Sequence, residues 1–192
     1  MTRAERSRST VRYGGVAQAL HWLVAVLAAI VVGFGWAAVA APHNSPARNG
    51  LLLVHRSVGL TILGLMVFRA LWRWRHPPPP LPPSFARFEA WLARLTHLGL
   101  YTAFVLMPFS GYVNSAAAGR PVSFFSLFEV PSLVPFSPRV SQWAIAVHLV
   151  AQYAVYLLVA LHIAGALFHA ILRRDGVLER MLPPPRGSPR PF

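Results

Sequence analysis

Four long apolar segments restrict what this chain can fold into. They cover about residues 16–41, 51–72, 96–117 and 142–172. A helix needs about 20 residues to cross the roughly 30 Å hydrocarbon core of a bilayer, so each segment is long enough. Hydrocarbon offers no water to backbone amides and carbonyls, and spanning segments of this kind must therefore be helices. The sequence predicts an all-α fold, a transmembrane four-helix bundle.

Arginine placement predicts the orientation of this bundle. All 18 basic residues are Arg, and the formal net charge is +13. Four precede the first segment, five surround the connection between the second and third, and five follow the fourth. Basic residues gather on the cytoplasmic face of membrane proteins, which predicts cytoplasmic termini in a bacterial inner membrane. In a soluble chain such charge would suggest nucleic acid; beside apolar segments it indicates membrane lipid, with no nucleic-acid partner.

The ends of the chain carry two further expectations. One transmembrane domain is predicted over residues 1–183, followed by a flexible cytoplasmic tail, 184–192. The small-residue stretch AAVAAP after the first segment resembles a signal-peptide cleavage site. However, the apolar run before it is about 25 residues long, against 7–15 in a usual signal peptide, so we expect the segment to be retained.

Six of the eight histidines lie within the apolar segments or at their ends, where polar groups are costly and often functional. His148 and His162 are fourteen residues apart. In a helix this separates them by about 21 Å along the axis and only about 40° around it. His21 comes early in the first segment, and His55 comes early in the second, which runs the opposite way. By depth, His21 therefore matches His162, and His55 matches His148.

Two histidine pairs at two depths indicate two metal centres. Imidazole binds zinc, copper, nickel or iron, but zinc usually takes three or four protein ligands. Haem needs only two axial ligands because the porphyrin supplies the others. The chain has no cysteine, which excludes covalent c-type attachment. Gly59 and Gly165 follow His55 and His162 by four and three residues, on the same helix faces, where they would leave room for a flat ring.

Other interpretations stay open at this point. A single histidine in a membrane helix can simply hydrogen-bond to a neighbouring helix, although four that pair by depth are harder to explain in that way. A proton or ion pathway in a transporter-like, non-redox bundle is weakened because no Asp or Glu lies within the four segments. His97 and His169, near the cytoplasmic side, are candidates for propionate or quinone contact, or for plain hydrogen bonds.

Six stretches form an ordered set along nearly the whole chain: ALHW (19–22), LVHRSVGLTILGLMVFRALWR (53–73) followed by prolines, THLGLY (96–101), MPFSGY (107–112), SAAAGRPVSFF (115–125) and HLVAQYAVYLLVALHIAGALFHAILRRDGVLERMLP (148–183). Together with the fourteen-residue histidine spacing, this set resembles the bacterial cytochrome b-561 family of four-helix membrane cytochromes. Ser126 stands where the family pattern predicts Gly, a difference that concerns loop shape and not the ligands.

The resemblance implies two non-covalent b-type haems. His21 and His162 would bind the inner haem iron on the cytoplasmic side, and His55 and His148 the outer one. It also implies electron transfer to or from quinone, with superoxide or a periplasmic redox partner as the donor. Related cytochromes serve as membrane subunits of hydrogenases and dehydrogenases, which is the alternative function.

Ligation by two histidines blocks both faces of an iron and favours electron transfer over oxygen binding. On the outer side, Arg56, Arg120 and Arg139 would attract an anionic donor, or would only set topology and contact phospholipid. The expected function is thus a di-haem cytochrome that connects an outer-side donor with membrane quinone. A haem-bearing subunit of a larger enzyme and a non-redox bundle are the remaining hypotheses.

Overall fold

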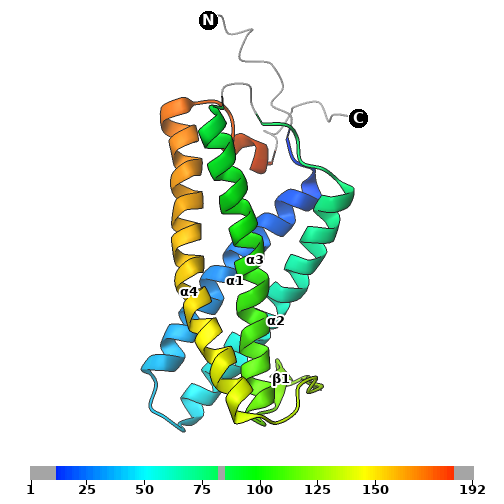
Figure 1. Ribbon diagram of the computed structural model, residues 1–192, viewed down its shortest axis with the longest axis vertical. Coiled ribbons are helices and arrows are strands. Elements are labelled where there is room, and N and C mark those ends of the chain that lie inside the picture. Colours follow the sequence, from blue (N-terminus) through cyan, green and yellow to red (C-terminus); the bar gives the residue numbers. More distant parts are fainter. Residues whose placement is uncertain (1–11, 82–84, 184–192) are drawn as a thin grey trace, which may run out of the picture.

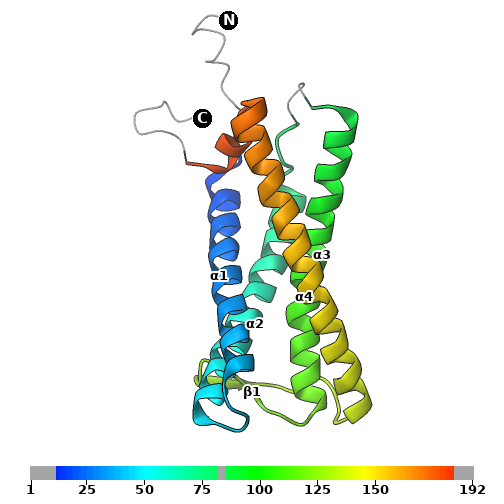
Figure 2. The same cartoon turned by 90° about the vertical axis from the view of Figure 1, so that its left-hand side faces the viewer.

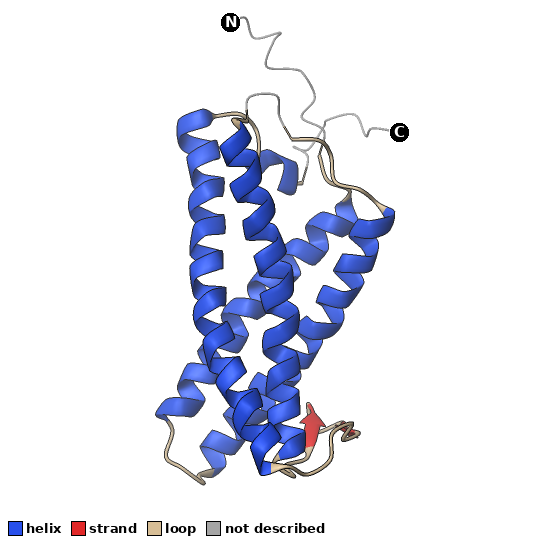
Figure 3. Cartoon of the chain, in the orientation of Figure 1, coloured by secondary structure: helices blue, strands red, loops and turns tan. Residues whose placement is uncertain are grey.

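Four long helices make up most of the protein. The computed structural model describes residues 12–81 and 85–183, so the predicted flexible tail lies outside the described residues. The helices are α1 (Gly15–Ala40), α2 (Pro46–Arg75), α3 (Arg87–Ala117) and α4 (Pro138–Leu167). All four are long and apolar enough to cross a membrane. The all-α, four-helix prediction is confirmed (Figures 1 and 3).

Two helices begin well before the predicted apolar segments because local capping extends them. The Ser45 hydroxyl accepts a hydrogen bond from the Arg48 amide at 3.1 Å, and Pro46 occupies the first turn of α2. The Glu89 carboxylate accepts one from the Ala86 amide at 2.8 Å, at the start of α3. Arginines and polar residues interrupt the apolar pattern in both first turns, so hydropathy alone placed both starts too late.

The helices pack as two antiparallel pairs, α1 with α2 and α3 with α4, and α2 joins the pairs through α3 (Figure 2). The buried cluster Val24, Val58, Ile62 and Met66 lies within the first pair. Between α3 and α4, a Cβ added at Gly99 would lie 3.0 Å from the Leu158 side chain. Apolar burial drives little association in lipid, so such close contacts of small residues hold the pairs together.

A short hairpin closes the end of the bundle that the arginine pattern assigns to the outer side. Strand β1 (Val122–Phe124) pairs with β2 (Phe128–Val130), at the lower end in Figure 1. Phe125 and Ser126 form its turn with φ of 49° and 60°, and the Leu127 amide donates to the Phe124 carbonyl at 2.9 Å. The Phe125 amide donates to the fully buried Ser57 hydroxyl of α2 at 2.8 Å. The hairpin is thus anchored to the helix that carries His55.

The opposite end is closed by the last described residues. After α4, a π-helical turn (Phe168–Arg173) and a 3₁₀ turn (Leu178–Met181) bring the chain back over α1. The Tyr13 amide donates to the Arg180 carbonyl at 3.1 Å, and the Trp22 indole donates to the Met181 carbonyl at 2.8 Å. The two ends of the described chain therefore lie on one side of the bundle. Which side of the membrane this is stays a prediction.

Candidate metal centres

His55 and His148 meet near the hairpin end. Their ring centroids are 6.1 Å apart, with an interplanar angle of 72°. His55 Nδ1 lies 2.9 Å from the Val31 carbonyl of α1, and His148 Nδ1 lies 2.8 Å from the Met107 carbonyl of α3. A carbonyl only accepts hydrogen bonds, so each Nδ1 carries the proton and each Nε2 keeps a free lone pair. That is the form of imidazole that binds a metal through Nε2.

Two glycines that the sequence reasoning missed make room for these rings. A Cβ added at Gly35 would lie 3.0 Å from Nδ1 and Cε1 of His55, and one added at Gly111 would lie 3.1 Å from the same atoms of His148. Each glycine follows the hydrogen-bonding carbonyl by four residues, on the same helix face. The arrangement is therefore repeated: α1 supplies a carbonyl and a glycine to a histidine of α2, and α3 supplies both to a histidine of α4.

His21 and His162 meet nearer the other end, with ring centroids 5.9 Å apart and an interplanar angle of 69°. A third histidine, His97 of α3, packs edge-on against His162 at 5.3 Å. His97 Nδ1 donates to the Ala93 carbonyl of its own helix at 2.6 Å. On the other side, Arg69 Nη2 of α2 lies 3.1 Å from His21 Nδ1. This inner pair thus has a cationic neighbour where the outer pair has neutral carbonyls. A guanidinium only donates, so His21 Nδ1 accepts in this contact, and a neutral His21 ring carries its proton on Nε2; the hydrogen-bond pattern of the outer pair is not repeated at His21.

Both pairs have the spacing that a single bound ion requires. A metal–imidazole bond is about 2.0 Å and the nitrogen lies about 1.1 Å from its ring centre, so two imidazoles opposite one another on an ion have centroids about 6.2 Å apart. The observed 5.9 and 6.1 Å are close to this value. Within the described residues, no cluster of three or more His, Cys, Asp or Glu could hold a metal ion. Two ligands per level suit a haem, whose porphyrin fills the other positions, and do not suit zinc.

The remaining predicted site residues are less closely tied to these pairs. An added Cβ at Gly165 would meet no atom within 4 Å, and the nearest atom to one at Gly59 is Pro108 Cβ at 3.9 Å. Space for a ring at these glycines stays a prediction. His169 is buried in the π-helical turn, where its Nδ1 lies 2.7 Å from an Asp175 carboxylate oxygen. Its ring also stacks on Phe85 at 4.3 Å, so it joins the helix end to the α2–α3 connection.

Comparison with known proteins covers almost the whole chain. The family model described as Prokaryotic cytochrome b561 matches residues 12–184. Cytochrome b561 homolog 2 of Escherichia coli (strain K12) is 32% identical over 171 residues, which are 89% of this chain and 91% of the relative. A Yersinia pestis protein named "Probable superoxide oxidase CybB" is 28% identical over 178 residues, 92% of this chain and 98% of the relative. Cytochrome b561 homolog 1 of Escherichia coli (strain K12) is 27% identical, over 85% of this chain and 93% of the relative.

Proposed function

Because the chain belongs to the prokaryotic cytochrome b561 family, we propose that it is a di-haem cytochrome connecting an outer-side electron donor with membrane quinone. Family membership makes it a b-type cytochrome of a bacterial membrane that acts in electron transfer, and its four spanning helices make it a multi-pass protein. The proposal adds the number of haems, their ligands and the two ends of the electron path. The chain is taken as a single functional domain with its termini in the cytoplasm.

The axial ligands are His55 and His148 for the outer haem, and His21 and His162 for the inner one. The observation that carries this assignment is the centroid spacing of the two pairs, 6.1 and 5.9 Å. A bound haem would supply an iron that takes up and releases one electron. With a histidine on each face of the iron, oxygen would be kept from the metal. Because α4 provides one ligand to each pair, a single helix fixes the two centres relative to one another.

The Val31 and Met107 carbonyls hold the outer imidazoles in position. They accept from the two Nδ1 atoms, which fixes the tautomer of each ring and leaves each Nε2 lone pair available to a metal. A ligand held in one position needs little reorganisation when the charge on an iron changes, which is what electron transfer requires.

The donor in this proposal is superoxide or a periplasmic redox protein. The name of the Yersinia pestis relative supports superoxide, and Arg56 and Arg120 would attract an anion to the outer end. Glu129 opposes this attraction in part, because it lines the same hollow as Arg120. Quinone is the proposed partner within the bilayer, on a side that the proposal leaves open.

Service as a haem-bearing subunit of a larger dehydrogenase or hydrogenase is the second candidate. It is favoured by exposed apolar side chains in the connection that holds the hairpin, Leu127, Leu133 and Phe136, which are 76%, 82% and 71% exposed. A partner protein on the outer side would cover them. The hairpin would then serve as a docking element.

The test is a haem-per-chain assay with reduced-minus-oxidised spectra of the purified full chain. We expect two haems, and His148→Ala should lose the outer haem and keep the inner one. His43→Ala is the matched control, because His43 is exposed in the α1–α2 connection. One haem or none in the wild type, or an unchanged spectrum in His148→Ala, contradicts the assignment. A superoxide pulse that reduces the haems without partner proteins favours the first function; no reduction favours the subunit.

A further inference from the structure

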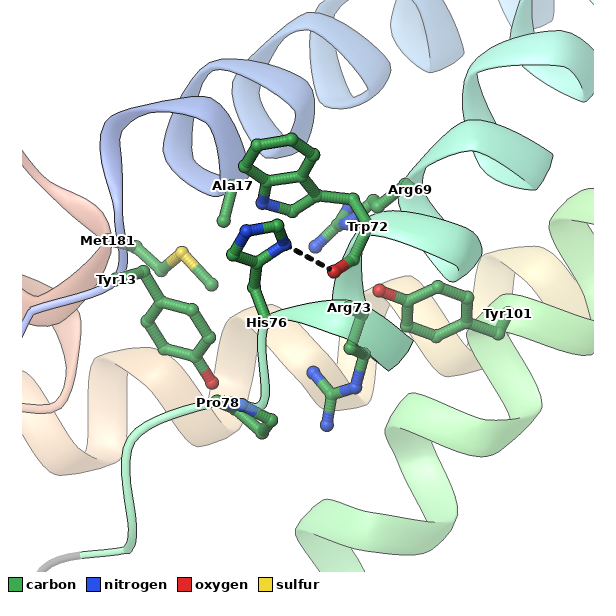
Figure 4. A pocket seen from close by; sticks show the side chains of 9 residues that line it. All are labelled: Tyr13, Ala17, Arg69, Trp72, Arg73, His76, Pro78, Tyr101 and Met181. Carbon is green, nitrogen blue, oxygen red and sulfur yellow. Dashed lines mark hydrogen bonds between the residues drawn. The ribbon is translucent and has the colours of Figure 1, made fainter.

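Two arginines of α2 meet one aromatic ring beside the inner histidine pair. Arg69 and Arg73 are four residues apart and share a helix face. Their guanidinium carbons lie 5.5 and 5.8 Å from the centroid of the Tyr101 ring of α3. Both line a cavity together with Tyr13, Trp72 and His76 (Figure 4). Arg69 also lies at hydrogen-bonding distance from His21, so one residue that lines this cavity contacts the inner pair.

These guanidinium groups have no acidic partner in the part of the chain that the structure describes. The ion pairs there are His169–Asp175 and Arg173–Glu89, and no residue that lines the cavity is acidic. Arg69 is partly buried and Arg73 is exposed, so both can reach the end of the membrane span. Two guanidinium groups on one face, with no acidic partner among the described residues, offer paired N–H groups that match a carboxylate.

The two histidine pairs differ in the polar groups that adjoin them. At the outer pair, both Nδ1 atoms donate to backbone carbonyls. At the inner pair, Arg69 donates to His21 Nδ1 at 3.1 Å, so the two arginines adjoin one of the two proposed ligands. Two sources could supply the anion: a carboxylate on a group held between His21 and His162, or the phosphate of a phospholipid. We argue for the first, because Arg69 contacts His21 itself.

We propose that Arg69 and Arg73 bind the propionate carboxylates of the inner haem. This inference rests on the proposed function, since it requires a haem between His21 and His162. The carboxylates of a bound haem would then lie towards the two arginines, at the end of α2 where Arg69 and Arg73 line the cavity. The same two positive charges favour the reduced state of the inner iron, because reduction removes one positive charge from it.

The test compares Arg69→Gln and Arg73→Gln with the control Arg75→Gln, all as purified full-length holoproteins. Arg75 is exposed on the same helix, outside the cavity lining, with its guanidinium carbon 6.0 Å from the Trp74 ring centroid. Transfer of haem to apomyoglobin should be about tenfold or more faster for the inner haem of the two cavity variants, as expected for a lost charge-assisted bond. The outer haem and Arg75→Gln should match the wild type.

Resonance Raman spectra provide a readout that a purely structural role would not change. The propionate bending band of the inner haem, identified as the one missing in His21→Ala, should shift in Arg69→Gln and Arg73→Gln. If Arg69→Gln does not accumulate, Arg69→Lys decides: it keeps the charge, so the inner haem should stay bound while its propionate band shifts, because an ammonium cannot form the paired bonds. A wild-type band in Arg69→Lys overturns the proposal.

Two further outcomes also overturn it. One is an unchanged transfer rate and an unchanged band in both glutamine variants. The other has two parts: the reduction potential of the wild-type inner haem changes with the phosphatidylglycerol content of the vesicles, and the propionate band stays constant in every arginine variant. That result would assign the site to lipid phosphate. A wild-type protein without two haems refutes the proposed function itself. Two haems that are both insensitive to Arg69 and Arg73 refute only this inference.

Discussion

Alanine at Gly35 or Gly111 should disrupt the outer centre without touching a ligand. The added methyl would lie 3.0 Å from the His55 ring or 3.1 Å from the His148 ring. Carbon contacts are most favourable at about 3.5–4.0 Å, so the ring would have to move by roughly 0.5 Å. It cannot do so freely, because its Nδ1 is held by the Val31 or Met107 carbonyl at 2.9 or 2.8 Å.

The expected magnitude follows from overpacking a close contact, which costs typically 1–3 kcal/mol. At about 1.4 kcal/mol for each factor of ten, outer haem binding should weaken roughly 5- to 150-fold, and the inner haem should not change. Gly33→Ala is the matched control on α1, since a methyl there meets no atom within 4 Å. It should keep both haems and gain up to about 1 kcal/mol of helix propensity.

The assay is haem transfer to apomyoglobin, followed at the α absorption band of the outer haem. The haem-per-chain ratio is a second measurement. Gly35→Ala and Gly111→Ala should release the outer haem faster than both the wild type and Gly33→Ala. Identical release from all four proteins would refute the reasoning, because it would mean that the glycines do not adjoin a haem ligand.

Two further predictions concern the hairpin at the outer end. Ser126→Gly should raise the midpoint of thermal unfolding in detergent and increase the free energy of unfolding by about 0.5–1 kcal/mol, because glycine adopts positive φ without the penalty of a Cβ. A lower midpoint would mean that the serine side chain compensates its own backbone strain. Ser57→Ala should lower the free energy of unfolding by about 1–3 kcal/mol, because it leaves the Phe125 amide without its 2.8 Å acceptor. Limited proteolysis should then cut the hairpin faster in Ser57→Ala than in the control Thr61→Ala, which removes a comparable hydroxyl hydrogen bond within α2.

The lengths of the apolar segments and the spacing of the histidines were enough to predict the four helices and the two histidine pairs. Four apolar runs of spanning length require four helices in lipid. The spacing of His148 and His162 on one helix then fixes two depths, and the antiparallel order of the helices brings His55 and His21 to those depths. The rings do meet in these pairs, although their binding of haem stays a prediction. Depth could be predicted because it depends only on the rise per residue.

The partners of the rings could not be predicted, because they depend on how two helices are rotated against each other. Val31 and Met107 contribute only their carbonyls, which every residue has, so their side chains give no signal. Gly35 and Gly111 looked like any other glycine in a membrane helix. Similarly, the contact of His169 with Asp175 depends on a π-helical turn and a reversal of the chain that no apolar pattern marks.

The repeated use of a carbonyl and a glycine explains why the two centres differ. Each helix pair, α1 with α2 and α3 with α4, holds one outer imidazole in the metal-binding form, and it does so through backbone groups that exist before any haem is bound. Such preorganisation lowers the conformational cost of binding. The inner imidazoles are held differently, by side chains and not by a carbonyl of the partner helix: His21 Nδ1 faces the Arg69 guanidinium of α2, and His162 packs against the His97 ring of α3. Their order therefore depends on side chains that can move, among them the arginines of α2 and whatever anion those arginines bind.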